Sequence, residues 1–303
     1  MVETKTKGNN SWQRKLIPLI YVAPACLFML CFIGIPVVFS VVMGFFYIPA
    51  LGTDWSFIGF QNFSYVLQEQ DMLFSFLRTL GFGAFSLVTT LVLGLLLAML
   101  VAGSKHLNFY RYIFYVPGVV SSVTMGMLWN QMLNATEFGI LNTVLRQLGI
   151  MQQPFQWLNS EQYTWMIVLA IGLIGCGGGM TLILFTTAIN EVSAEVKESA
   201  VVEGANVWQL NTRIILPLIR PTLFSWMILS IIGSLKSFEF IYALTSGGPA
   251  NTTTTLAILL FANDKGSIYG YGYSSALGVF MSIIVLAFTG VYWWLGDRKS
   301  SEV

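Results

Sequence analysis

Lys236 and Glu239 are oppositely charged side chains inside a long apolar run of this 303-residue chain. A charged group near the centre of a bilayer costs about 2.5–3.5 kcal/mol, so such residues usually serve a function. Three residues apart on a helix, the two would share a face and could offset each other's charge. Ser230, Ser234 and Ser237 follow spacings of four and three, which places their hydroxyls on a similar face. This face predicts an internal ion pair, a polar cavity that binds solute hydroxyls, or both.

The sequence lacks the residues that most catalytic mechanisms require. It contains no G-x-x-x-x-G-K-[ST] phosphate-binding loop, so any ATP must be bound by another polypeptide. His106 is the only histidine, which excludes an H-E-x-x-H zinc site and a Ser-His-Asp triad. The three cysteines lie in apolar runs, and the net charge of +1 indicates no nucleic-acid partner. We therefore expect a chain that is not an enzyme and has no catalytic residue, metal site or cofactor of its own.

Long apolar segments must position these side chains. The chain is 55% hydrophobic and 10% charged, with a mean hydropathy of +0.72, which is too apolar for an ordinary soluble domain. Helices of about 20 apolar residues cross the roughly 30 Å hydrocarbon layer. Six such runs are found at 17–47, 76–102, 112–133, 164–189, 222–245 and 272–295. The predicted fold is an all-α, polytopic membrane protein with six transmembrane helices, with a tail over 1–16 and a membrane domain over 17–303.

Lysine and arginine are distributed unequally between the two ends of the predicted spans. An even number of spans places both termini on one side, and positive residues accumulate on the cytoplasmic side. The opposite loops carry only Arg78, Arg146 and Lys265. The tail, the second and fourth loops and the C-terminus carry the larger set: Lys5, Lys7, Arg14, Lys15, Lys105, Arg111, Lys197, Arg213, Arg220, Arg298 and Lys299. Both termini and the fourth loop, over 190–221, should therefore face the cytoplasm.

A polar, charged island occupies this fourth loop, from Glu198 to Pro217. Its pattern predicts two short helices joined at a turn. Gly204 should end the first helix, because glycine tolerates the left-handed conformation found there. Trp208 offers a bulky apolar contact beyond the turn, and Pro217 marks where the next span can begin.

An alternative for the same loop is an amphipathic helix lying on the inner leaflet. Glu195, Glu198 and Glu203 argue against it, because anionic lipid would repel them. The loop is therefore expected to contact protein.

The spacing of this island resembles the EAA loop of the carbohydrate-uptake class of binding-protein-dependent ABC importer permeases. Four further segments are similar to motifs of that family, in the same order, and the resemblance extends from about residue 17 to residue 295. These segments are Ile58–Phe63, Pro117 after 112–116, Leu244–Pro249 with Asn251–Thr255, and Tyr271–Ala276.

The resemblance implies a type I ABC importer permease fold with no catalytic residue. It implies an ATPase-coupling role for the residues of the EAA motif: Glu198, Ser199, Ala200, Glu203, Gly204, Ala205, Trp208 and Pro217. It also implies substrate binding by residues of the fifth span and by a glycine stretch before it: Ser230, Ser234, Lys236, Ser237, Glu239 and Gly178.

The resemblance further implies a set of partners in a bacterial or archaeal cell membrane. These are a second permease subunit, usually a paralogue, two ATP-binding subunits or a homodimer that hold ATP and Mg²⁺, and an extracellular solute-binding protein. Together they would import a sugar or a related solute by alternating access.

Three departures from the family pattern bear on this interpretation. Ser199 replaces a more common alanine, Glu203 replaces a more common aspartate, and Lys236 stands where a neutral amide is frequent. The charge of Lys236 leaves open an ion-coupled secondary transporter that uses Lys236 and Glu239. A structural membrane scaffold is a third possibility.

Overall fold

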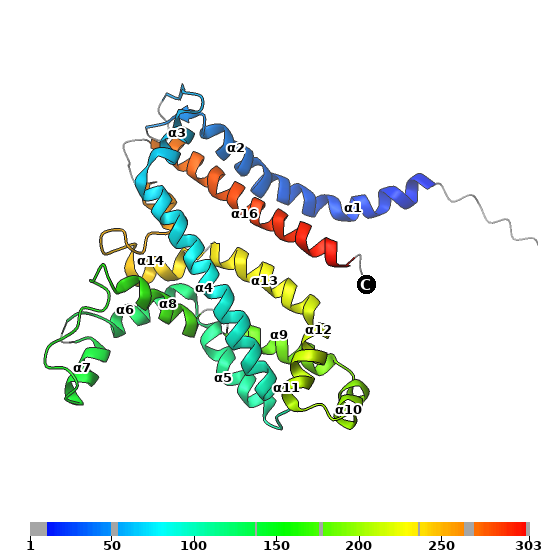
Figure 1. Cartoon of the computed structure of the whole chain (residues 1–303). Helices are drawn as coiled ribbons and strands as arrows, with labels where there is room; N and C mark the ends of the chain where they lie inside the picture. The colour runs from blue at the N-terminus through cyan, green and yellow to red at the C-terminus, as the bar shows by residue number, and fades with distance from the viewer. Residues whose placement is uncertain are drawn as a thin grey trace, which may run out of the picture. The chain divides into compact units, whose positions relative to one another are not determined.

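The described part of the chain is mostly helical, with a two-stranded antiparallel hairpin (Figure 1). The computed structural model describes residues 11–49, 54–136, 138–175, 178–235, 237–263 and 270–300, so Lys236 lies outside the described residues. Two compact units are formed, Met1–Val66 with Asn263–Phe280 and Leu67–Ala262 with Met281–Val303. The predicted all-α fold is confirmed.

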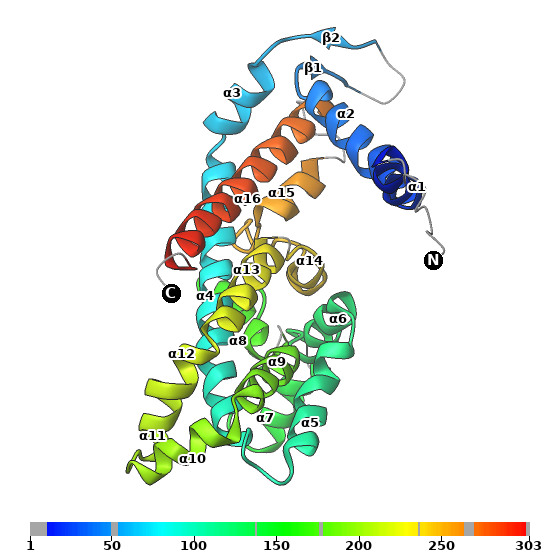
Figure 2. The same cartoon turned by 90° about the vertical axis from the view of Figure 1, so that its right-hand side faces the viewer.

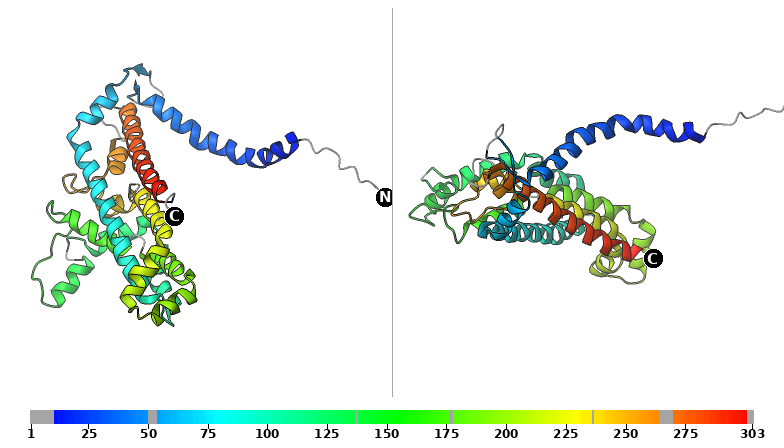
Figure 3. Two further views of the ribbon diagram at one scale, coloured as in Figure 1. Left: turned by 45° about the vertical axis from the view of Figure 1, so that its right-hand side comes forward. Right: turned by 90° about the horizontal axis from the view of Figure 1, so that it is seen from above.

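The first unit begins with a long apolar helix, which Figure 3 shows in blue as one continuous, curved helix. α1 (Ser11–Met29) passes through a π-helical turn (Leu30–Gly34) into α2 (Ile35–Met43). The hairpin of β1 (Phe46–Tyr47) and β2 (Ser56–Phe57) follows, with Phe46 opposite Phe57, and then α3 (Gln61–Gln68) (Figure 2).

The buried amide of Asn62 closes the chain after α2. It donates hydrogen bonds to the carbonyls of Gly44 and Phe46, each at a distance of 2.9 Å. These two carbonyls lie beyond the end of the helix, where no intrahelical donor reaches them. Asn62 therefore fixes the connection between α2 and the hairpin.

The second unit contains the helices that form both candidate sites. α4 (Gln70–Val101) is followed by α5 (Leu107–Val119) and α6 (Ser122–Met132), which are bent by 86°. The remaining helices are α7 (Ile140–Gln147), α8 (Thr164–Gly175), α9 (Gly178–Glu191), α10 (Ala194–Val202), α11 (Val207–Gln209), a π-helical stretch (Leu210–Ile215), α12 (Leu216–Leu218), α13 (Arg220–Leu235), α14 (Glu239–Thr245), α15 (Leu256–Asn263) and α16 (Gly270–Ser300), the last of which begins in the first unit.

Two buried apolar clusters hold the second unit together. One joins α4, α8 and α14 through Phe82, Val168 and Ile241. The other joins α4 to α9 through Ala98 and Phe185 and extends to the residues around α12. In a bilayer, such clusters hold helices together through van der Waals packing, because lipid tails are as apolar as these side chains.

Helices occupy every predicted span, but not all of them are single helices. Among the described residues, Ile20–Met43, Gln70–Val101 and Gly270–Ala287 are each long and apolar enough to cross a membrane. The run 112–133 forms the bent pair α5 and α6, and α13 forms another bent pair with the helices before it. The count of six spans stays a prediction.

The prediction of one continuous helix through Lys236 and Glu239 is wrong. α13 ends at Leu235 and Glu239 begins α14, with Ser237 and Phe238 outside both helices. The Ser237 hydroxyl donates to the Ser234 carbonyl over 2.6 Å, a local bond that competes with the helical pattern. The helical spacing argument for a Lys236–Glu239 ion pair therefore fails, although the pair itself lies partly outside the described residues.

Candidate functional site

The predicted EAA loop folds as a helix–turn–helix. Gly204 adopts a φ of 88° immediately after α10 and its C-cap residue Glu203. The Ala205 N–H donates to the Ala200 carbonyl and the Gly204 N–H donates to the Val201 carbonyl, each at a distance of 3.0 Å. This is the Schellman arrangement, which satisfies carbonyls at a helix end and requires a residue that tolerates positive φ. The expectation that Gly204 ends the first helix is confirmed.

The second helix starts two residues later with a capping box. The Asn206 side chain accepts from the Gln209 N–H over 2.8 Å, and the Gln209 side chain accepts from the Asn206 N–H over 3.0 Å. Both bonds satisfy N–H groups that have no intrahelical partner. Two successive terminal motifs thus define the angle between α10 and α11.

This helix–turn–helix presents an exposed apolar surface, formed by Val201, Val202, Val207 and Trp208. The side chains of Val202 and Trp208 are 87% and 66% exposed. An exposed apolar group of this kind marks a contact with a partner protein or with the membrane. Glu198, Ser199, Glu203 and Pro217 are also exposed, whereas Ala200 is buried.

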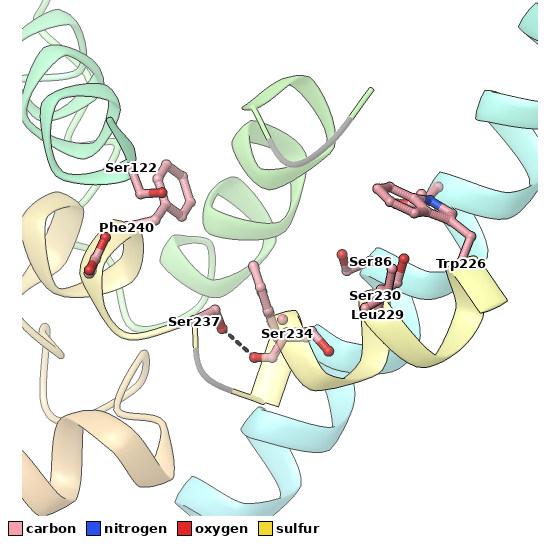
Figure 4. Close-up of a pocket in the computed structure, with 12 residues that line it drawn as sticks. Ser86, Ser122, Trp226, Leu229, Ser230, Ser234, Ser237 and Phe240 are labelled. Atoms are coloured by element: carbon pink, nitrogen blue, oxygen red, sulfur yellow. Dashed lines mark hydrogen bonds between the residues drawn. The ribbon is translucent and has the colours of Figure 1, made fainter. Parts of the chain in front are cut away.

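A cavity of about 320 Å³ lies in the second unit, between α4, α6, α13 and α14. The described lining residues supply hydroxyls, aromatic rings and the Glu239 carboxylate: Phe82, Ser86, Thr90, Ser122, Trp226, Leu229, Ser230, Gly233, Ser234, Ser237, Glu239 and Phe240. Figure 4 shows Ser234 and Ser237 at the break between α13 and α14, with Ser122 and Phe240 nearby.

The structure brings four predicted substrate residues together. Ser230, Ser234, Ser237 and Glu239 all line the cavity. Gly178 is the first residue of α9 and is not among the described lining residues.

The hydroxyls of Ser234 and Ser237, at the break between α13 and α14, both donate to backbone carbonyls. Ser234 Oγ donates to the Ile231 carbonyl over 2.9 Å, and Ser237 Oγ donates to the Ser234 carbonyl over 2.6 Å. Because each hydroxyl has one proton, these two oxygens present lone pairs as acceptors. A solute with hydroxyl donors would complement them.

Sequence reasoning missed Ser86, Thr90 and Ser122. Ser86 and Thr90 lie four residues apart in α4, so their spacing places them on one helix face and could have revealed them. Ser122 reaches the cavity because the chain bends between α5 and α6, and neither Pro117 nor Gly118 predicts that bend angle.

Two acidic residues, Glu69 and Asp71, lie at the start of α4, away from the cavity. Burial raises the pKa of the Glu69 carboxyl, and the charge of Asp71 raises it further. The Asn251 amide donates to Asp71 Oδ2 over 3.5 Å, which connects the 246–255 loop to α4. The ionised form of Glu69 is therefore disfavoured at this end of the helix.

The chain is similar to permease proteins of known transport systems. It is 28% identical to the trehalose/maltose transport system permease protein MalF of Thermococcus litoralis, over 85% of this chain and 90% of that protein. It is 30% identical to the sn-glycerol-3-phosphate transport system permease protein UgpA of Agrobacterium fabrum, over 94% of this chain and 96% of that protein.

The fold also matches a solved structure, that of a bacterial alginate ABC transporter in complex with an alginate pentasaccharide-bound periplasmic protein. The TM-score is 0.81 at 22% identity, covering 96% of this chain and 98% of that one. The family model for binding-protein-dependent transport system inner membrane components matches residues 7–301. This chain, a multi-pass membrane protein, therefore belongs to that family of transport permeases.

Proposed function

We propose that this chain is the permease subunit of an ATP-driven importer for a sugar or a related polyhydroxylated solute. The observation that carries the proposal is the cavity between α4, α6, α13 and α14, whose lining supplies several hydroxyls and three aromatic rings. Hydroxyl acceptors suit a polyol, and aromatic rings pack on the apolar face of a sugar ring. The relatives that transport trehalose, maltose and glycerol phosphate support this substrate class.

The helix–turn–helix at α10 and α11 is the proposed site of ATPase coupling. Its exposed apolar surface would lie in a cleft of the ATPase, while Gly204 and the capping box fix the angle at which it is presented. Glu198, Ser199, Glu203 and Ala205 would surround this contact, and Pro217 would separate it from α13.

The partners proposed for this chain supply the functions that its own sequence lacks. This sequence has no phosphate-binding loop, so two ATP-binding subunits, identical or paralogous, would hold ATP and Mg²⁺. A second permease subunit, a paralogue of this chain, would complete the pathway, and an extracellular solute-binding protein would deliver the substrate. The alginate transporter solved with its periplasmic protein supports such an assembly.

Alternating access is the proposed mechanism. ATP binding would close the ATPase pair and displace the docked helix–turn–helix, which opens the cavity outward. Ser230, Ser234 and Ser237 would then bind solute hydroxyls, with Glu239 as a charged acceptor, and hydrolysis would return the cavity to the cytoplasmic side. Lys236 and Gly178 remain candidate substrate residues. Both termini would face the cytoplasm, because the positive residues accumulate there.

Uptake by cells tests this function. A strain that lacks the chain should lose uptake of a labelled compound from a panel that includes maltose, trehalose and glycerol 3-phosphate. Gly204→Asp and Glu198→Lys should leave membrane insertion intact and abolish that uptake. Normal uptake in both variants would contradict the coupling role.

The alternative of an ion-coupled transporter has its own test. The purified chain alone, in ATPase-free liposomes under a proton or sodium gradient, should not accumulate the labelled compound. Accumulation under these conditions would favour that alternative. Family membership disfavours it.

A further inference from the structure

The C-terminal end of α9 is attached to α10 by a side chain. Lys197 Nζ, half-buried on α10, donates to the Ile189 carbonyl in the last turn of α9 over 2.7 Å. The last carbonyls of a helix have no intrahelical donor and carry the negative end of the helix dipole. A lysine ammonium suits both properties. Lys197 therefore adds a charge-assisted bond to the short covalent link between the two helices.

The other end of α9 is attached to the wall of the cavity. Trp226 Nε1, on α13, donates to Thr181 Oγ1 over 3.0 Å, and the Trp226 ring lines the cavity. Thr181 is fully buried in the first turn of α9. Both ends of this one helix thus contact a candidate site.

Close packing fixes α9 between these two attachments. Gly94 of α4 leaves no room for a Cβ because Thr181 lies against it, and Gly179 lies against the backbone of Phe114 and Tyr115 in α5. Arg111 of α5 donates to Thr186 Oγ1 over 2.9 and 2.7 Å. Interiors packed this closely transmit displacement instead of absorbing it.

We propose that α9 carries the displacement of the ATPase-docking segment to the cavity wall, and that Lys197 and Trp226 are the positioning residues at its two ends. The inference rests on the proposed function. Lys197 makes the C-terminal end of α9 move together with α10. Trp226 makes α13 move together with the N-terminal end of α9. Neither residue needs to touch the ATPase for this role.

A thiol in the cavity can report the transmission without knowledge of the substrate. Ser230→Cys is introduced after Cys26, Cys31 and Cys176 are replaced by alanine. The chain is purified with its copurifying ATPase in nanodiscs, and the labelling rate by a charged methanethiosulfonate is measured with and without ATP plus vanadate. Nucleotide should change this rate by at least about fivefold, the lower end of measured allosteric couplings.

Substitutions at the two ends should remove that change. Lys197→Met keeps an unbranched side chain, one atom shorter, that has no donor, and Trp226→Phe keeps an aromatic ring without the N–H, so both should lose most of the nucleotide effect. Lys197→Arg should retain it, as should the control Lys105→Met on an exposed cytoplasmic lysine. Because both residues act through α9, the double variant should lose no more than the more severe single variant.

The outcomes separate this inference from the proposed function. Absence of any nucleotide effect with Lys197 intact would contradict the proposed function itself. A full effect in Lys197→Met, or losses that multiply in the double variant, would overturn the role of α9 alone. Loss of copurifying ATPase in Lys197→Met would also overturn it, because Lys197 would then act in docking.

Discussion

The side-chain amide of Asn130 on α6 donates a hydrogen bond to the Leu244 carbonyl near the end of α14, over 2.7 Å. One turn earlier on α6, Gly126 lies against the Ala243 methyl and the Phe240 carbonyl. The later halves of two interrupted helical runs are therefore joined to each other. Because Phe240 lines the cavity, this contact determines the position of one of its walls.

Gly126→Ala should disrupt this contact. A Cβ there would approach the Ala243 Cβ and the Phe240 carbonyl oxygen to 2.7 Å, so the helices must separate. Overpacking of this kind typically costs about 1–3 kcal/mol. The thermal midpoint of the detergent-purified chain should fall. Gly81→Ala in α4, which meets no atom within 4 Å, is the matched control and should leave the midpoint unchanged or higher. Equal midpoints would contradict the predicted role of the contact.

The sequence predicts some features of these sites well. Gly204 was identifiable as a helix end because its surroundings contain a helical pattern on both sides, and local bonds alone form the turn. Ser230 and Ser234 share a face of α13 because four residues are close to one helical turn. Such features depend on residues that are neighbours in sequence.

The break between α13 and α14 could not be predicted in the same way. No proline interrupts Ser230–Tyr242, and the position of α14 depends on Asn130, which is 114 residues away from its partner Leu244. The same distant packing brings Ser122 to the cavity. Periodicity describes a helix face and contains no information on the partners that bend the chain.

Substitutions at Gly204 should test whether the glycine is needed for its positive φ or for the space that a side chain would fill. A Cβ at this position would meet no atom within 4 Å, so only the φ of 88° resists substitution. Gly204→Ala should cost about 1–2 kcal/mol, whereas Gly204→Asn should cost less because asparagine tolerates the left-handed region. The amount of ATPase that copurifies with each variant measures the effect. Recovery at the level of the unsubstituted chain in both variants would show that the turn is not required.

Asn142 should stabilise the segment around α7. Its amide donates to the carbonyls of Asn134 and Phe155, and its oxygen accepts from the Phe155 N–H and from Trp157 Nε1, all within 3.1 Å. Each such bond contributes about 0.5–1.5 kcal/mol, and the partly buried partners Asn134, Phe155 and Trp157 would lose it. Asn142→Ala should therefore expose residues 134–157 to limited proteolysis and faster amide exchange.

The exposed Gln147 on the same helix provides a control, because Gln147→Ala removes an amide without removing this network. Similar proteolysis of both variants would contradict the anchoring role of Asn142.

Glu69 should make the stability of the chain depend on pH. Burial and the charge of Asp71 raise the pKa of its carboxyl in the folded state. A raised carboxyl pKa penalises the ionised form, so stability is lost as pH rises above the unfolded pKa and is restored by acid. Glu69→Gln should raise the thermal midpoint at pH 7, with a difference that shrinks toward pH 4. A constant difference across this range would exclude ionisation as the cause.

Glu239 should report the charge of the transported solute, because it is the only ionisable side chain among the described lining residues. A neutral sugar would donate a hydroxyl to the carboxylate, and such a bond to a charged group exceeds a neutral one by about 1 kcal/mol. Glu239→Gln should then raise the KM for uptake by roughly fivefold, whereas Ser225→Ala, on an exposed face of α13, should leave it unchanged. An anionic solute gives the opposite sign, since removal of a like charge lowers the KM. A lowered KM in Glu239→Gln would therefore exclude a neutral sugar and favour a phosphorylated or acidic one.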